Sequence, residues 1–259
     1  MVINGGTNKI LVYNYSGKLL QTNFGNRLLS KRVTTPSLIV ELLDKTIAVF
    51  DKSTKQIKKI SRDEDLVATF QIGLETHSLT INHYGHLVMA HKASRNKRIV
   101  SIRDSSSGHV LHFLEIPLHP QSIVDAPFYA IYSLPSHIVT LDPSSCSLSM
   151  HTIDGAVQYS VGKKGFLSGN LHSPSSLCQD SKGNIIVADN RNDRVVRYRA
   201  ETNMKTCDTI LSLYRPLCVA IDKSDHLIVV TAKSISVYEY DIRRAPVAYH
   251  VPALIDGVL

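Results

Sequence analysis

A repeated segment in the C-terminal half constrains the fold of this chain more than any other feature. Pro174 and Asp180 each have a counterpart 42 residues downstream, at Pro216 and Asp222. Repeats of roughly 40 to 45 residues arise when one supersecondary unit is copied along a chain, because a single unit cannot bury its apolar face alone. The repeat therefore predicts an architecture of stacked copies.

The residues after Pro174 show what one copy contains. A short apolar run ends at Cys178, a polar turn that includes Gly183 follows, and two further apolar runs occupy 185–189 and 195–199, with a polar loop between them. Glycine permits the positive φ that a tight turn between strands often requires. Short strands separated by polar turns within about 40 residues are the pattern of one blade of a β-propeller.

Weaker copies of this pattern begin near Pro36, His77 and Pro120, and the two chain ends together are expected to make one more. The chain is therefore predicted to be an all-β, six-bladed β-propeller with four antiparallel strands per blade, in a single domain over residues 1–259. The predicted blades are about 1–30 closed by 251–259, 31–72, 73–115, 116–165, 166–211 and 212–250.

The first blade is expected to lack its innermost strand. Val2 aligns with Val187, which lies in the second apolar run of the clearest copy. The segment Val251–Gly257 has the pattern of the missing strand and its turn, and ring closure would remove two unpaired strand edges. We therefore predict that residues 251–259 complete the first blade; the alternative is a first blade that stays incomplete.

Composition excludes several classes of protein. No apolar run reaches the roughly 18 residues that a membrane helix needs, and the N-terminus lacks the basic and apolar regions of a secretory signal. The four cysteines form no CxxC pair and no Cys/His zinc spacing, and 259 residues can bury a core without disulfides. We expect reduced thiols, no metal, no cofactor and a cytoplasmic location.

The positive charges are predicted to gather on one face. In a propeller, the loops between second and third strands and the links between blades lie on one face, here called the loop face; the remaining turns form the turn face. The net charge is +7, and most of the excess Lys and Arg residues fall in loop-face segments, with the densest run at His91–Arg98. Such a face suits a polyanion; the alternative is ordinary solvated loops.

The candidate binding residues are the cations and flat side chains of the loop face. The cations are Lys31, Arg32, Lys52, Lys55, Lys92, Arg95, Lys97, Arg98, Lys163, Lys164, Arg191 and Arg215. The flat side chains, which could stack on bases or pack against the next blade, are Phe24, Phe166, Tyr214, His77, His91 and His172.

Asp189, Asn190 and Asn192 lie in or beside one loop, and we expect different roles for the carboxylate and for the two amides. Asn190 and Asn192 could hydrogen-bond to base edges, although asparagine at such positions is also a common turn former. Asp189 is expected to accept hydrogen bonds from the backbone of its loop rather than act in catalysis.

One segment carries a family resemblance. Residues Gly162–Tyr198 closely resemble an NHL repeat through Gly162, Gly165, Gly169, Pro174, Asp180, Gly183, Val187, Asp189, Asn192 and Arg194. The nearest resemblance is to the C-terminal NHL domains of tripartite-motif (TRIM-NHL) ubiquitin ligases. It implies a six-bladed propeller that binds RNA or protein partners. Ligase activity is not implied, because this sequence holds no RING or B-box cysteines.

Three functions remain open. The first is a non-catalytic, monomeric module whose basic face binds single-stranded RNA in post-transcriptional regulation. The second is a protein–protein recognition domain that recruits substrates to a ubiquitin ligase. The third is a propeller enzyme, such as a metal-dependent lyase or hydrolase. The sequence disfavours an enzyme, because the innermost runs, for example Leu38–Val40 and Leu79–Ile81, are apolar and no catalytic motif is present.

Overall fold

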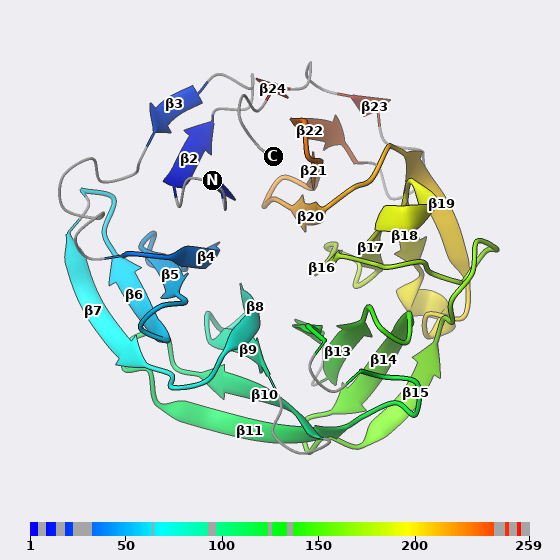
Figure 1. Ribbon diagram of the computed structural model, residues 1–259, viewed down its shortest axis with the longest axis horizontal. Coiled ribbons are helices and arrows are strands. Elements are labelled where there is room, and N and C mark those ends of the chain that lie inside the picture. The colour runs from blue at the N-terminus through cyan, green and yellow to red at the C-terminus, as the bar shows by residue number, and fades with distance from the viewer. Residues whose placement is uncertain are drawn as a thin grey trace. The chain divides into compact units, whose positions relative to one another are not determined.

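The computed structural model describes residues 1–4, 9–13, 19–22, 33–63, 65–92, 97–123, 126–133, 137–240, 247–248 and 253–254. The fold is an all-β propeller whose strands form antiparallel sheets in chain order (Figure 1). Its contacts divide the chain into two compact units, Met1–Asn14 with Lys18–Pro117, and Tyr15–Gly17 with Leu118–Leu259. No helix in the described ranges has the length and apolar character to cross a membrane.

The first unit holds three sheets. The first sheet contains β1 (Val2–Asn4), β2 (Lys9–Tyr13) and β3 (Leu19–Thr22). The second contains β4 (Pro36–Glu41), β5 (Ile47–Asp51), β6 (Gln56–Ile60) and β7 (Leu66–Gln71). The third contains β8 (Thr76–Ile81), β9 (Leu87–His91), β10 (Lys97–Arg103) and β11 (Val110–Pro117).

The second unit also holds three sheets. The first contains β12 (Tyr129–Ser133), β13 (His137–Asp142), β14 (Ser147–Thr152) and β15 (Val157–Val161). The second contains β16 (Ser176–Gln179), β17 (Ile185–Asp189), β18 (Arg194–Tyr198) and β19 (Cys207–Ser212), with the 3-10 helices η1 (Asn190–Asn192) and η2 (Ala200–Thr202) between strands. The third contains β20 (Cys218–Ile221), β21 (His226–Val230), β22 (Ser234–Glu239), β23 (Val247–Ala248) and β24 (Ala253–Leu254).

In the described residues the structure has five blades rather than the predicted six. Five sheets contain the four antiparallel strands expected of a blade, whereas β1, β2 and β3 form a sheet of three strands. The predicted closure by 251–259 is wrong for the two residues of that segment that are described. Ala253 and Leu254 form β24 and pair with Ile235 and Ser234 of β22, so they extend the last blade instead of completing the first sheet. The rest of 251–259 lies outside the described residues.

The first turns of the two blades that begin at β16 and β20 follow the predicted chemistry. In the β16–β17 turn, Asp180 Oδ1 accepts hydrogen bonds from the backbone N–H groups of Lys182 (3.0 Å) and Asn184 (2.8 Å). Gly183 has φ 84°, which confirms the positive φ expected there. The β20–β21 turn repeats the arrangement, with Asp222 Oδ1 accepting from the backbone N–H of His226 at 2.9 Å.

The core lies between neighbouring blades. Successive side chains of each second strand point to opposite faces of the sheet and pack into the clusters on its two sides. All five residues of β17 are buried. Val187 packs into a cluster with β13 and β14, whereas Ile186 and Ala188 face a cluster with β20 and β21. Full burial of a large aliphatic side chain stabilises the fold by about 1.5–3 kcal/mol. In the first unit, Phe50 of β5 and Met89 of β9 share an equivalent cluster.

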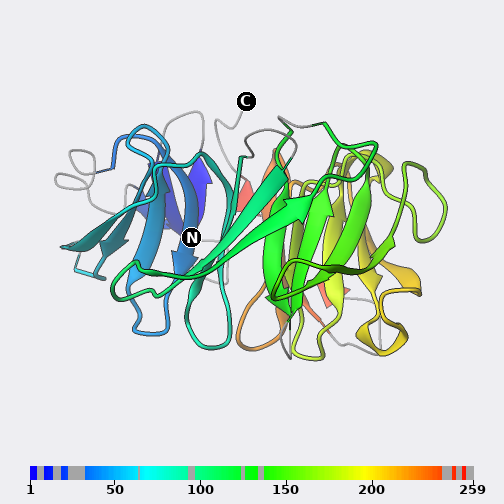
Figure 2. The ribbon, with the colours of Figure 1, turned by 90° about the horizontal axis from the view of Figure 1, so that it is seen from below.

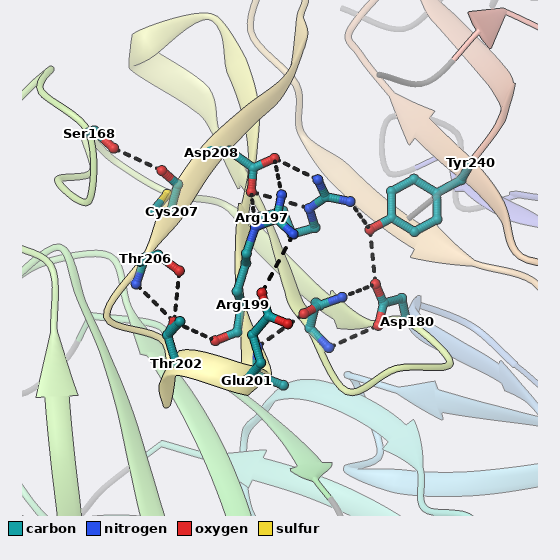
Figure 3. Close-up of polar contacts among 12 residues, drawn as sticks. Ser168, Asp180, Arg197, Arg199, Glu201, Thr202, Thr206, Cys207, Asp208 and Tyr240 are labelled. Carbon is teal, nitrogen blue, oxygen red and sulfur yellow. Dashed lines mark hydrogen bonds and ion pairs between the residues drawn. The ribbon is translucent and has the colours of Figure 1, made fainter. Parts of the chain in front are cut away.

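A buried polar network also joins the last two blades (Figure 3). The Arg197 guanidinium, whose side chain is 3% exposed, donates to Asp208 Oδ2 at 2.6 Å and to the Tyr240 hydroxyl at 3.3 Å. The Tyr240 hydroxyl in turn donates to Asp180 Oδ2 at 2.9 Å. Burial raises the pKa of Tyr240 above its ordinary value, so the phenol keeps the proton that this donation needs.

Candidate functional site

The carboxylate of Asp189 organises the best-defined loop-face region of the second unit. Asp189 ends β17 and is fully buried. Its Oδ1 accepts from the backbone N–H of His172 at 2.7 Å, and its Oδ2 accepts from Asn192 Nδ2 at 2.7 Å and from Arg194 Nε at 2.8 Å. One buried anion therefore joins the segment before β16, the helix η1 and the start of β18. Asp189 therefore has a structural role, although its donors are the His172 backbone and two loop side chains rather than the expected backbone of its own loop.

The segment 163–172 is fixed against η1 and β18. Asn192 Nδ2 donates to the Gly165 carbonyl at 2.8 Å, and Arg194 Nη2 donates to the carbonyls of Leu167 (3.2 Å) and Asn170 (2.9 Å). The side chains that this segment turns outward include Phe166, 78% exposed, and Leu167, 63% exposed. Exposed apolar side chains on a backbone held this closely are typical of a binding surface.

The link between β19 and β20 is fixed to the same helix. Asp193, which follows η1, accepts from the backbone N–H of Leu213 through its carbonyl (2.9 Å) and from that of Arg215 through Oδ1 (3.0 Å). Asn190 Nδ2 donates to the Pro216 carbonyl at 3.0 Å. The Tyr214 ring is 68% exposed, and the Arg215 guanidinium carbon lies 5.6 Å from its centre. Such a distance allows a cation–π interaction.

These three segments together form one surface, which we call the lead-in surface. Its exposed members are Lys163, Lys164, Phe166, Leu167, Ser168, Arg191, Asp193, Tyr214, Arg215 and Leu217. Of the two acidic residues in segments 163–172, 189–194 and 213–217, Asp189 is buried against Arg194 and only Asp193 is exposed. The field above this surface is therefore positive, because four exposed cations face a single exposed carboxylate.

Seven of the sequence-predicted residues meet at the lead-in surface. They are Lys163, Lys164, Phe166, Arg191, Asn192, Tyr214 and Arg215. Asn192 differs from the others, since both acceptors of its amide group are protein oxygens. Asn190 uses its amide in the same way. The structure therefore supports the turn-forming role of these asparagines, which position the surface.

The structure describes four residues of the densest basic run, His91, Lys92, Lys97 and Arg98, and these four do not form an open basic surface. β9 extends to His91, which is fully buried, and β10 begins at Lys97. Arg98 is 4% exposed, so the prediction that its charge faces a ligand is wrong. Lys97 is paired with Glu115. Lys92, at the end of β9, is half-buried.

Two of the remaining predicted cations, Lys52 and Lys55, lie in the described part of the chain. Lys52 is exposed and lies 3.7 Å from Glu75, and Lys55 is exposed in the β5–β6 loop. The other predicted residues, Phe24, Lys31, Arg32 and Arg95, lie outside the described residues.

Sequence reasoning did not single out Leu167, although its side chain is among the most exposed apolar groups described. The available signal was the pair Phe166–Leu167 between Gly165 and Gly169, because two large apolar residues in a glycine-bounded loop have little chain of their own to pack against.

The buried histidines are structural. His91 forms a hydrogen bond with Thr76 Oγ1 through Nδ1 (3.1 Å) and another with Ser101 Oγ through Nε2 (2.6 Å). Burial lowers the pKa of His91 to about 3 and that of His151 to about 4, so both are neutral at pH 7. In the ranges that the structure describes, no three His, Cys, Asp or Glu side chains are grouped as metal ligands.

Solved structures that resemble this fold include propellers named as enzymes. A streptogramin B lyase is 16% identical, with TM-score 0.62, over 84% of this chain and 69% of that one. A virginiamycin B lyase from Staphylococcus aureus is 16% identical, with TM-score 0.59, over 84% and 70%. A luciferin-regenerating enzyme is 12% identical, with TM-score 0.59, over 87% and 78%. At these identities the likeness shows a shared fold.

The comparison corrects one sequence-based expectation. We expected no enzyme, yet the three propellers above are named as two lyases and a luciferin-regenerating enzyme, and none of the three is named as a tripartite-motif protein. The expectation that this chain is not an enzyme is therefore overturned.

Sequence comparison supports the repeat itself. No curated protein matches the chain at a significant level. The model of the NHL repeat family matches residues 171–198, which run from the end of segment 163–172 through β16, β17 and β18. The segment that organises the lead-in surface is thus an NHL repeat, carried on a β-propeller.

Proposed function

We propose that the lead-in surface binds single-stranded RNA, as expected of a module in post-transcriptional regulation. One observation carries the proposal: four exposed cations and two exposed aromatic rings share a surface whose three backbone segments are tied together by Asp189, Asn190, Asn192 and Asp193. RNA-binding surfaces for unpaired strands combine these two kinds of side chain.

Each side chain has a separate task in this proposal. Lys163, Lys164 and Arg191 contact phosphates, which gives most of the affinity and little sequence preference. Phe166 and Tyr214 stack on bases, which is worth about 1–3 kcal/mol per base in such sites. The cation–π contact with Arg215 holds the Tyr214 ring in place before RNA arrives, so less conformational entropy is lost on binding.

A protein partner would use the same surface differently. Phe166 and Leu167 could enter an apolar pocket of a partner, as in the recruitment of substrates to a ubiquitin ligase. We favour RNA because the exposed cations outnumber the exposed carboxylates by four to one in these segments. Binding that persists after nuclease treatment and at high salt would point to the protein partner instead.

Fluorescence anisotropy with labelled, mixed-sequence single-stranded RNA tests the proposal. Three phosphate contacts predict that the logarithm of the affinity falls with the logarithm of salt concentration with a slope of about −2. The variant K163E/K164E/R191E should lose affinity by at least about tenfold. The matched control K182E/K205E/K223E reverses three exposed lysines of turn-face segments. Equal losses in both variants, or no binding by the unaltered protein, would refute the proposal.

A further inference from the structure

We propose that Arg215 forms hydrogen bonds with the base that stacks on Tyr214 and selects guanine there, an inference that rests on the proposed RNA binding. The two residues lie in the link between β19 and β20 (Figures 1 and 2). Tyr214 is 68% exposed, and the guanidinium carbon of Arg215 lies 5.6 Å from the centre of its ring. This distance is near the outer limit of about 6 Å for a cation–π contact, so the guanidinium leaves ring surface free for a base.

The backbone at Arg215 is bent in a way that brings the two side chains together. Neighbouring side chains of an extended chain point to opposite sides. Arg215 instead has φ 42°, in the left-handed region, directly before Pro216. This conformation is costly for a residue other than glycine, and more so before proline. Ser173, directly before Pro174, has the same bend with φ 49°, so the repeat supplies the bend and the arginine is particular to the β19–β20 link.

The bent link is fixed on both sides of the Arg215 side chain. The backbone N–H of Arg215 donates to Asp193 Oδ1 at 3.0 Å. The Pro216 carbonyl accepts from Asn190 Nδ2 and from Ser175 Oγ, each at 3.0 Å. These bonds use only the backbone of the link. Among the described residues, the Arg215 guanidinium has no hydrogen-bond or ion-pair partner, so its N–H donors are available to a ligand.

A guanidinium beside a stacking ring favours one base over the other three. Its planar fork donates two parallel hydrogen bonds, and guanine presents two neighbouring acceptors, O6 and N7. Adenine has an amino donor beside N7, and uracil has an N–H group between its two carbonyl oxygens, so each opposes one of the two donors. Cytosine has two neighbouring acceptors, but its single ring covers less of a tyrosine than a purine does. Guanine therefore combines the larger stacking surface with the acceptor pair.

Anisotropy titrations with short uridine oligonucleotides whose middle base is guanine, adenine, cytosine or uracil test the proposal. The guanine oligonucleotide should bind the unaltered protein about tenfold more tightly than the all-uridine one. Arg215→Lys keeps the charge but removes the planar fork, so it should abolish this preference and leave the salt dependence of uridine binding unchanged. Arg191→Lys, at an exposed arginine of the same surface, is the matched control and should change all four affinities by the same factor.

Guanine selection and RNA binding fail separately in this experiment. Binding without a preference, a preference for another base, or a guanine preference that survives Arg215→Lys would overturn guanine selection and leave RNA binding intact. Equal loss of the preference in Arg215→Lys and Arg191→Lys would overturn the assignment to Arg215. Absence of binding to all four oligonucleotides would overturn both proposals.

Discussion

Asp189 and Arg194 form an ion pair of 2.8 Å in which the carboxylate is fully buried and the guanidinium side chain is 14% exposed. The same guanidinium also donates to the backbone carbonyls of Leu167 and Asn170 in segment 163–172. Arg194 therefore holds the segment that carries Lys163, Lys164 and Phe166 against the ends of β17 and β18. Its loss should affect both stability and binding.

Replacing Asp189 by Asn should destabilise the fold by about 3 kcal/mol, because removing one partner leaves a largely buried cation unpaired. Urea unfolding followed by circular dichroism measures the change. Asp193→Asn is the matched control, because Asp193 is exposed and directly follows η1. This substitution should lower the free energy of unfolding far less. Similar losses for the two variants would show that the buried pair has no special role.

Tyr240→Phe should lower the free energy of unfolding by about 1–2 kcal/mol. The substitution keeps the ring but removes the hydroxyl that connects Arg197 with Asp180, and it leaves these two groups without one hydrogen-bond partner. Tyr214→Phe, on a ring that is 68% exposed, should leave thermal unfolding unchanged. If the two variants unfold alike, the network of Figure 3 does not stabilise the joined blades.

Acid should weaken the fold through its buried histidines. Burial lowers the pKa of His91 to about 3 and that of His151 to about 4, whereas an unfolded histidine titrates near 6.5. Between these values the unfolded chain binds more protons than the folded one, so stability falls as pH drops from about 6.5 toward 4. Each histidine should cost on the order of 3 kcal/mol by pH 4.

Urea unfolding at several pH values checks this histidine effect, and His91→Gln should flatten the curve between pH 6.5 and 4. Asp44 acts at lower pH. Burial raises its pKa, but hydrogen bonds from Lys59 and Thr46 outweigh burial and lower it to about 2. Its stabilisation is present above about pH 4 and is lost below that. A stability that does not change from pH 7 to 4 would contradict the assignment of neutral buried histidines.

Alanine at Phe166 or Tyr214 should lower RNA affinity about tenfold, because each substitution removes one stacking platform. The slope of affinity against salt should stay the same, since no cation is removed. Anisotropy titrations at two salt concentrations separate the two effects. Leu217→Ala, at a 42% exposed residue of the same link, serves as the control for loss of apolar surface.

The local pattern of the sequence predicted the blade interiors well and their closure poorly. The run after Pro174 marked β16, β17 and β18 closely, because strand alternation and turn residues act over a few positions. The pairing of β24 with β22 joins residues about twenty apart and competes with the expected pairing to the first sheet. Local pattern holds no information on which of two sheet edges a short apolar strand will join.

The site was predicted in the same uneven way. The structure brings Lys163, Arg191 and Tyr214 together because links between blades and loops between second and third strands lie on the same face. The sequence pattern around Arg98 was interpreted as a loop, so an exposed guanidinium was expected. In the structure β10 starts at Lys97, and strand alternation turns the Arg98 side chain inward. The ties from Asp193 to the β19–β20 link depend on long-range geometry that spacing alone does not reveal.

Ultraviolet cross-linking of single-stranded RNA that contains 4-thiouridine, followed by peptide mass spectrometry, tests the central claim most directly. The claim is that the lead-in surface is where RNA binds. The predicted result is cross-linked peptides from segments 163–172 and 213–217, with Phe166 and Tyr214 as the modified rings, and their loss in K163E/K164E/R191E. Cross-links confined to turn-face segments, such as those around Lys182 and Lys223, would contradict the claim.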